Sequence, residues 1–361
     1  MQNYLLLINL HDNEFNMHVE TVTHKIFDMI ESKFFTNKKQ LVDTVSEVLH
    51  LQPSSIYKKI KGESSISLEE AEILAKHFRI SLDEILGLSE DKIYFDFPAL
   101  YGAVKDHRDF IDPIRQDLEN LRLLNPIIYY STKELPLFYY FLFPKLKSFK
   151  FYVFFNFNWR LDETIIKPYE ENDYCFDEEF NKITRRILDL YSEINSIEIW
   201  TTSVLDNTFN QLRYLSEAGL IKSRVQALEI LDDVDRLIDT IAEIIKSKNK
   251  SVLKDKNGGE PGSIELYNNE ILHTNNIIYV KSTAHEAVYN TYDNPNFMRS
   301  ISPVLCQFTN RWFERIIQNS VPVSFGNIKD QNAFISRTKE KSIRCRSNLN
   351  NIFDHRENPD L

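Results

Sequence analysis

Apolar residues between His18 and Leu88 recur at spacings of three and four residues, with interruptions at short intervals. This period is typical of short amphipathic helices, because a strand would alternate apolar and polar positions instead. Glu70 stands three residues after Ser67, which is the spacing of a capping box at the start of a helix. The pattern predicts five helices, over His18–Phe35, Lys38–Leu49, Pro53–Gly62, from Ser67 onward and from Ser81 onward.

Helical and strand periods alternate in the rest of the chain. Helices are expected over Phe110–Leu124, Glu178–Ile194, Val204–Leu220 and Arg224–Lys246. An apolar stretch follows the first of them at Ile127–Ser131, and a strand is expected over Ser196–Thr202. Alternating segments at Ile264–Ile271, Ile277–Ser282 and Glu286–Tyr292 predict an antiparallel meander, with two closing helices at Phe297–Gln318 and Asp330–Asn348. The predicted fold class is therefore α+β, with an all-α five-helix N-terminal domain and a C-terminal α+β domain with flanking helices.

The length of 361 residues favours two or three domains. The segment SEDKIYFD at residues 89–96 has the composition of a linker. We expect an all-α domain at residues 1–88, the linker at 89–96, an α+β domain at 97–350 and a polar tail at 351–361. Fourteen of the 34 residues from Ile127 to Arg160 are aromatic, a density that favours a core or a subunit interface over a ligand site.

The formal net charge of -10 argues against a general polyanion binder but leaves room for a local basic face. Residues 1–90 hold 9 basic and 14 acidic side chains. Within them, residues 37–62 hold five lysines, Lys38, Lys39, Lys58, Lys59 and Lys61, against Asp43 and Glu47, a local charge of +3. A second basic segment at residues 337–346 holds five basic side chains and one acidic. It is interpreted either as a solvated helix face or as an auxiliary contact to phosphates or to an acidic partner surface.

The spacing of residues 38–88 resembles the helix-turn-helix of phage-repressor-like transcription regulators, the Cro/C1 or XRE type. The resemblance rests mainly on SSIYKKIKGE at residues 54–63 and ISLDEIL at residues 80–86. Ser46 is the small residue where the second and third helices would cross. The sequence departs from the pattern at His50, which stands where the family prefers a turn glycine, and at Lys59 with Ile60, which inverts the usual order of apolar and polar residues.

This resemblance implies that the third helix lies in the major groove of double-stranded DNA. Gln can pair with adenine through two hydrogen bonds, and Lys can reach guanine or phosphate. The residues assigned to DNA binding by the resemblance are Gln52, Ser54, Ser55, Tyr57, Lys58 and Lys61, and the local basic charge adds Lys38 and Lys39. One helix-turn-helix reads only a short half-site, so a homodimer is expected.

Little else in the sequence points to chemistry. The cysteines Cys175, Cys306 and Cys345 are odd in number and widely spaced, so we expect neither a disulfide framework nor a zinc site, and a reducing cytoplasm as the compartment. No signal peptide is expected, and Leu137–Phe157 is interrupted by Pro144 and three lysines, which disfavours a membrane span. No cofactor, metal site or catalytic residue is expected.

The preferred hypothesis is a transcription regulator whose C-terminal domain dimerises and senses an unidentified small-molecule effector. The first alternative is an enzyme that carries a helix-turn-helix targeting module, in which case residues 91–361 would hold a deep polar pocket with converging titratable groups. The second alternative is a protein-docking interaction or defence component whose helices bind protein instead of DNA.

Overall fold

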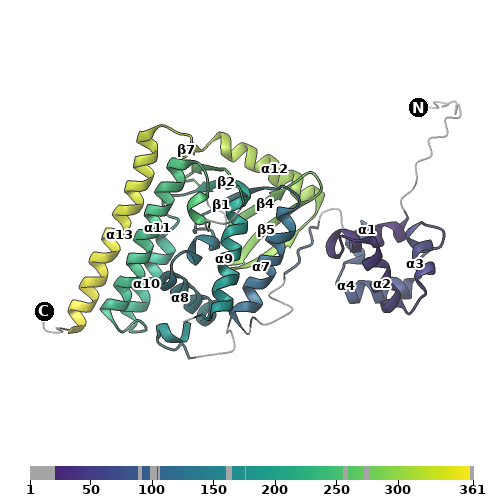
Figure 1. The fold of residues 1–361 in the computed structure, drawn as a ribbon, viewed down its shortest axis with the longest axis horizontal. Helices are drawn as coiled ribbons and strands as arrows, with labels where there is room; N and C mark the ends of the chain where they lie inside the picture. Colours follow the sequence, from purple (N-terminus) through teal and green to yellow (C-terminus); the bar gives the residue numbers. More distant parts are fainter. Residues whose placement is uncertain are drawn as a thin grey trace, which may run out of the picture. The chain divides into compact units, whose positions relative to one another are not determined.

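The computed structural model describes residues 21–87, 92–97, 104, 106–159, 165–174, 176–254, 259–271 and 276–357. The chain separates into two compact units, residues 1–92 and 93–361 (Figure 1). Each unit has its own hydrophobic core. No helix in the described part of the chain is long and apolar enough to cross a membrane.

The described part of the N-terminal unit, residues 21–87, is a cluster of five helices, as the apolar period predicts. They are α1 (Val22–Phe34), α2 (Lys38–Leu49), α3 (Pro53–Ile60), α4 (Leu68–Phe78) and α5 (Leu82–Leu86). The predicted capping box is confirmed, because Ser67 and Glu70 exchange hydrogen bonds between side chain and backbone at the start of α4. Each helix contributes apolar residues to one core, which includes Ile26, Leu41, Val45, Ile56 and Leu74. The predicted start of the first helix, residues 18–20, lies outside the described residues.

The C-terminal unit is built on a seven-stranded mixed sheet with strand order β6-β5-β4-β1-β2-β3-β7. The strands are β1 (Ile127–Thr132), β2 (Asn195–Trp200), β3 (Ile264–Asn268), β4 (Ile277–Lys281), β5 (Glu286–Asp293), β6 (Asn296–Ser300) and β7 (Val321–Pro322). Strands β1, β2 and β3 run parallel, and β4, β5 and β6 form an antiparallel meander beside β1.

The predicted meander is present, but its strands differ from those expected. β3 leaves it and pairs in parallel with β2, while β6 supplies the third strand where a helix was expected to begin at Phe297. The helix α12 (Pro303–Gln318) begins only at Pro303, after the N-cap Ser302. Alternation identified the strands correctly, whereas their partners depend on contacts between distant segments.

Helices cover both faces of this sheet (Figure 1). The larger core lies between one face and the helices α7 (His107–Arg122), α8 (Pro144–Phe154), α9 (Glu178–Glu193), α10 (Asp206–Glu217), α11 (Arg224–Ser247) and α13 (Ile328–Glu357). Helix α12 covers the other face, where Phe313 packs with Tyr279 and Ile199. The aromatic segment at residues 127–160 supplies much of the larger core, as predicted, including the fully buried Tyr139 and Phe149.

Helix α13 changes two expectations about the end of the chain. It continues to Glu357, so the polar tail predicted at residues 351–361 begins too early. The reason is Phe353, which is buried in the larger core and holds the last turns of the helix in place. In the basic segment at residues 337–346, three of the five basic side chains pair with aspartates of α10 and α11: Lys339 with Asp239, Lys341 with Asp206, and Arg346 with Asp232 and Asp235. Three of the five basic side chains of this segment therefore form ion pairs within the C-terminal unit.

Candidate nucleic-acid interface

Helices α2 and α3 are joined by a tight turn centred on His50. Its backbone adopts the left-handed conformation, with φ 54° and ψ 38°. The amide of Leu51 donates to the carbonyl of Ser46 at 3.0 Å, which is the long hydrogen bond of a Schellman motif. Glycine is usually preferred at such a position because a Cβ atom is disfavoured there. The structure thus places His50 at the position where the repressor-like pattern has its turn glycine.

Replacing His50 with glycine is expected to stabilise the N-terminal unit by about 1 kcal/mol, because the left-handed conformation costs an L-residue roughly that amount. Urea unfolding followed by helical circular dichroism would measure the change. The matched control is Glu47→Gly on the exposed face of α2, which should destabilise by about 1 kcal/mol because glycine is a poor helix former. A destabilised His50→Gly variant would contradict the turn geometry.

The first turn of α3 presents polar groups to solvent. Gln52 is the N-cap residue, and its exposed side chain makes no capping hydrogen bond. Pro53 follows at the first helical position, as expected for a residue without an amide hydrogen. The side-chain amide of Gln52 therefore remains available for a base edge, and the helix start offers backbone N–H groups to a phosphate.

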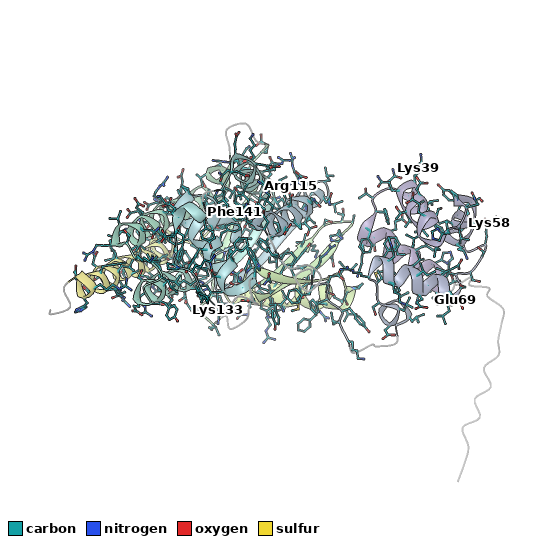
Figure 2. The ribbon with its side chains drawn as sticks, turned by 90° about the horizontal axis from the view of Figure 1, so that it is seen from below. Lys39, Lys58, Glu69, Arg115, Lys133 and Phe141 are labelled. Carbon is teal, nitrogen blue, oxygen red and sulfur yellow. The ribbon has the colours of Figure 1, made fainter. Side chains whose placement is uncertain are left out.

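The residues proposed for DNA binding lie on the outer surface of α2 and α3. Gln52, Ser54, Tyr57, Lys58 and Lys61 are exposed, as are Lys38 and Lys39, while Ser55 is half-buried. Tyr57 keeps 41% of its surface exposed, so it is not a core residue. Ile56 points the opposite way and is completely buried, as expected for the anchor of the third helix. Figure 2 shows Lys39 and Lys58 projecting outward from this unit.

Lys59 differs from its neighbours because its side chain turns inward. Its ammonium group lies 2.9 Å from the Glu70 carboxylate and donates to the carbonyl of Ser65 at 2.8 Å. The same Glu70 oxygen accepts the Ser67 amide in the capping box, so Glu70 joins the end of α3 to the start of α4. The inverted order at Lys59 and Ile60 is thereby explained, since a paired lysine occupies an inward position. Sequence reasoning missed this role of Glu70.

The pairing of Lys59 reduces the basic face that DNA could meet. Four exposed lysines remain against the exposed Asp43 and Glu47, so the surface charge of residues 37–62 is +2, not +3. Lys38 and Lys39 occupy the first turn of α2, where Asn37 caps the amide of Lys39 at 2.8 Å. The helix dipole is positive at this end, so the two lysines add to a site that favours phosphate.

Helix α3 ends at a second left-handed turn. Gly62 has φ 75°, and the amide of Glu63 donates to the carbonyl of Lys58 at 2.9 Å. A Cβ atom on Gly62 would come within 2.7 Å of the His24 ring of α1. The closing glycine of the motif is thus favoured by the backbone conformation, and any side chain at this position would have to displace the His24 ring.

Two short helices held at a tight turn, with the second exposing polar and basic side chains, define a helix-turn-helix unit. Residues 19–96, which are 78 of the 361 residues, match the BetR domain, a helix-turn-helix-like DNA-binding domain. No curated protein and no solved structure matches the chain. The match indicates a DNA-binding regulatory role for the N-terminal unit.

Proposed function

We propose that this protein is a DNA-binding transcription regulator of the repressor-like, Cro/C1 or XRE type, that acts as a homodimer. In this proposal the third helix α3 enters the major groove, where Gln52 reads a base and Lys58 and Lys61 contact guanine or phosphate. The observation that carries the proposal is the exposed face of α3 on a unit that matches the BetR domain. The acidic remainder of the chain disfavours non-specific binding, which suits a regulator that selects few sites.

A dimer is proposed because the charge of this face is small. Four exposed lysines can neutralise few phosphates, and each phosphate contact adds only a modest, salt-dependent amount of affinity. Two copies on a two-fold axis would double these contacts and read two half-sites about one helical turn apart. In this proposal the C-terminal unit forms the dimer contacts and responds to a small-molecule effector.

Selection from a random duplex library at about 150 mM salt tests the DNA-binding proposal with the full chain. The expected result is an inverted repeat whose half-sites lie about 10 base pairs apart, bound by two copies of the chain. Light scattering of the protein alone would give the mass of a dimer. Selected sequences without any shared motif would contradict DNA recognition, and a single half-site bound by one copy would contradict the dimer.

A further inference from the structure

A pocket of about 580 Å³ with a mixed polar and apolar lining lies at one edge of the sheet in the C-terminal unit. Its lining comes from the chain after β1, from α8 and the π-helical turn Phe155–Trp159 that follows it, from α10, from the residue before β4 and from the end of β5 with the turn to β6. From β1 the chain moves in one direction to β2 and β3, and it then returns to place β4 on the other side of β1. In open α/β sheets, ligands commonly bind beyond the carboxyl ends of the parallel strands, and Lys133 and Glu134 of the lining follow the carboxyl end of β1.

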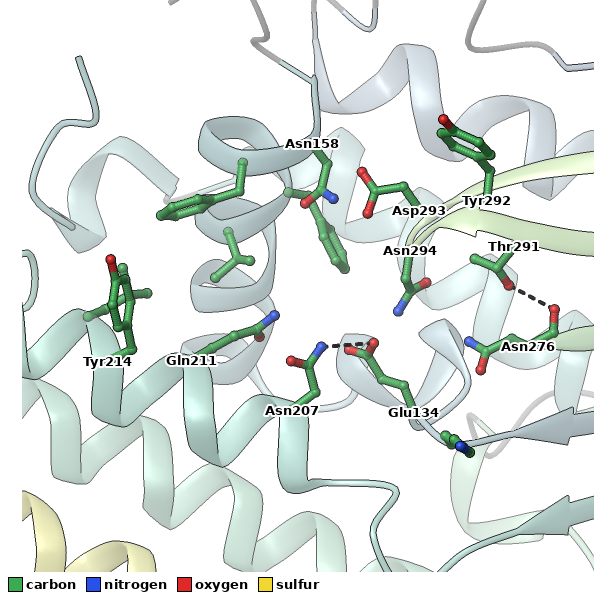
Figure 3. Close-up of a pocket in the computed structure, with 15 residues that line it drawn as sticks. Glu134, Asn158, Asn207, Gln211, Tyr214, Asn276, Thr291, Tyr292, Asp293 and Asn294 are labelled. Carbon is green, nitrogen blue, oxygen red and sulfur yellow. Dashed lines mark hydrogen bonds between the residues drawn. The ribbon is translucent and has the colours of Figure 1, made fainter. Parts of the chain in front are cut away.

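Five carboxamide side chains line this pocket, and Figure 3 shows them around a common space. They are Asn158, Asn207, Gln211, Asn276 and Asn294. Each carboxamide combines an acceptor oxygen with an amino group that donates two hydrogen bonds. The lining therefore offers both hydrogen-bond donors and hydrogen-bond acceptors without adding charge.

Three of these amides are held by the protein at one end only. The Asn207 amino group donates to Glu134 at 3.0 Å, and the Gln211 oxygen accepts from Lys150 at 3.0 Å. The Asn276 oxygen accepts from a buried threonine of β1 at 2.6 Å. Among the described residues, the opposite atoms of these amides, one oxygen and two amino groups, have no hydrogen-bond partner. The internal bonds fix the orientation of each amide and leave its other end for a ligand.

The charges around the pocket balance. Lys133, Glu134 and Asp293 line it, and the completely buried Lys150 lies behind Glu134 with its ammonium 2.9 Å from the carboxylate. Two positive and two negative groups leave no excess charge for an anionic or cationic ligand. The pocket therefore favours a neutral molecule, which the amides can bind without an unpaired charge being buried.

Glu134 is suited to accept hydrogen bonds. Burial by itself raises the pKa of this carboxyl group, but the charge of Lys150 and hydrogen bonds from Lys150, Asn294 and Asn207 outweigh burial, and the pKa is lowered. The group is a carboxylate at neutral pH, which favours a role in binding hydroxyl groups over a role as a proton donor.

One wall of the pocket is apolar. Phe154 is buried, whereas Phe157 and Tyr214 are 38% and 61% exposed at the pocket lining. Aromatic faces beside directional polar groups are the usual composition of small-molecule sites of roughly 300 to 1,000 Å³. The C–H face of a sugar ring matches an aromatic surface, while its hydroxyl groups, each both donor and acceptor, match amides and a carboxylate.

We propose that this pocket binds a neutral polyhydroxylated molecule through a sugar ring, presented either by a free mono- or disaccharide or by the ribose of a nucleoside. The site rests on the pocket alone. Its use as an effector site for DNA binding rests in addition on the proposed function, and the two can fail separately because binding is measured without DNA.

Isothermal titration of the full chain tests the site with a panel of neutral monosaccharides, disaccharides and nucleosides, and with sugar phosphates and inorganic phosphate. At least one neutral compound is expected to bind one molecule per chain, and comparison of saccharides with nucleosides identifies the source of the sugar ring. Asn158→Ala removes an amide that has no described partner and should weaken this binding about tenfold. Asn210→Ala, an exposed amide on α10 outside the pocket, is the matched control and should bind as the wild type does.

The proposal is overturned if no neutral compound of the panel binds at millimolar concentration. It is also overturned if only the phosphorylated compounds bind, or if Asn158→Ala binds every compound as tightly as Asn210→Ala does. Equal thermal unfolding midpoints of the two variants would exclude misfolding as the cause of a loss. A loss confined to Asn158→Ala in a folded protein supports the site.

Discussion

Lys61→Ala is expected to weaken binding to all DNA sequences by a similar factor, whereas Gln52→Ala is expected to change which sequence is preferred. Lys61 is exposed at the end of α3, and its proposed contact is to phosphate, which carries no sequence information. Gln52 stands at the N-terminus of α3 with an uncommitted amide, and its proposed contact is to an adenine edge.

The two variants are distinguished by the salt dependence of their DNA affinity and by their preference among DNA sequences. Loss of one phosphate contact should reduce the slope of log affinity against log salt by about 1, and loss of one bidentate base contact should remove roughly 1 to 3 kcal/mol of discrimination at a single base pair. Titration of the selected sequence and of its single-base variants at three salt concentrations measures both quantities.

Lys76→Ala is the matched control for the loss of positive charge. Lys76 is a surface lysine of α4 whose side chain is 77% exposed and pairs with Glu72 in the same helix. Its removal should leave DNA affinity nearly unchanged, since it belongs to neither α2 nor α3. If Gln52→Ala and Lys61→Ala changed sequence preference and salt slope in the same way, the proposed orientation of α3 on DNA would be wrong.

The N-terminal unit was largely predictable because its helices depend on local signals. The capping pair Ser67 and Glu70, the proline at the start of α3 and the apolar period each act within a few residues. The inward turn of Lys59 was not predictable from period alone. It depends on Glu70, eleven residues away, which supplies the charge that allows a lysine to occupy a nearly buried position.

The C-terminal unit was predictable in its elements and much less in their arrangement. The alternation of apolar and polar residues in β3 is the same whether the strand pairs with β4 or with β2. The parallel pairing with β2 depends on the helices α10 and α11, which connect the two strands. The pocket was even less predictable from the sequence, because its amides come from four separate parts of the chain. An isolated asparagine such as Asn158 or Asn276 gives no signal in the sequence until the fold brings these residues together.

Lys150→Met is expected to destabilise the C-terminal unit by about 3 to 5 kcal/mol at pH 7, the cost of leaving one partner of a buried ion pair alone. Methionine is an unbranched side chain of similar length, but it lacks the ammonium that lies over the rings of Tyr140 and Phe154, 4.5 Å and 5.4 Å from their centres, so the loss is mainly electrostatic. The carboxylate that remains is Glu134, whose side chain is only 12% exposed. Urea unfolding followed by tryptophan fluorescence measures the change, since Trp159 and Trp200 both lie in this unit.

The pH dependence of stability distinguishes loss of the ion pair from loss of packing as the cause of the destabilisation. In the wild type the folded-state pKa of Glu134 is lowered, so the pair contributes stability above the unfolded pKa of about 4.3, and this contribution is lost as the pH falls through the folded value. Without Lys150, the lowering effect of its charge is lost, burial dominates, and the pKa of Glu134 should rise. The carboxyl group then takes up a proton at a higher pH than in the wild type, so the difference in stability between the wild type and Lys150→Met should narrow as the pH falls below 7. The double variant Glu134→Gln with Lys150→Met should regain most of the lost stability at pH 7, and a double variant no more stable than Lys150→Met alone would contradict the ion pair as the cause.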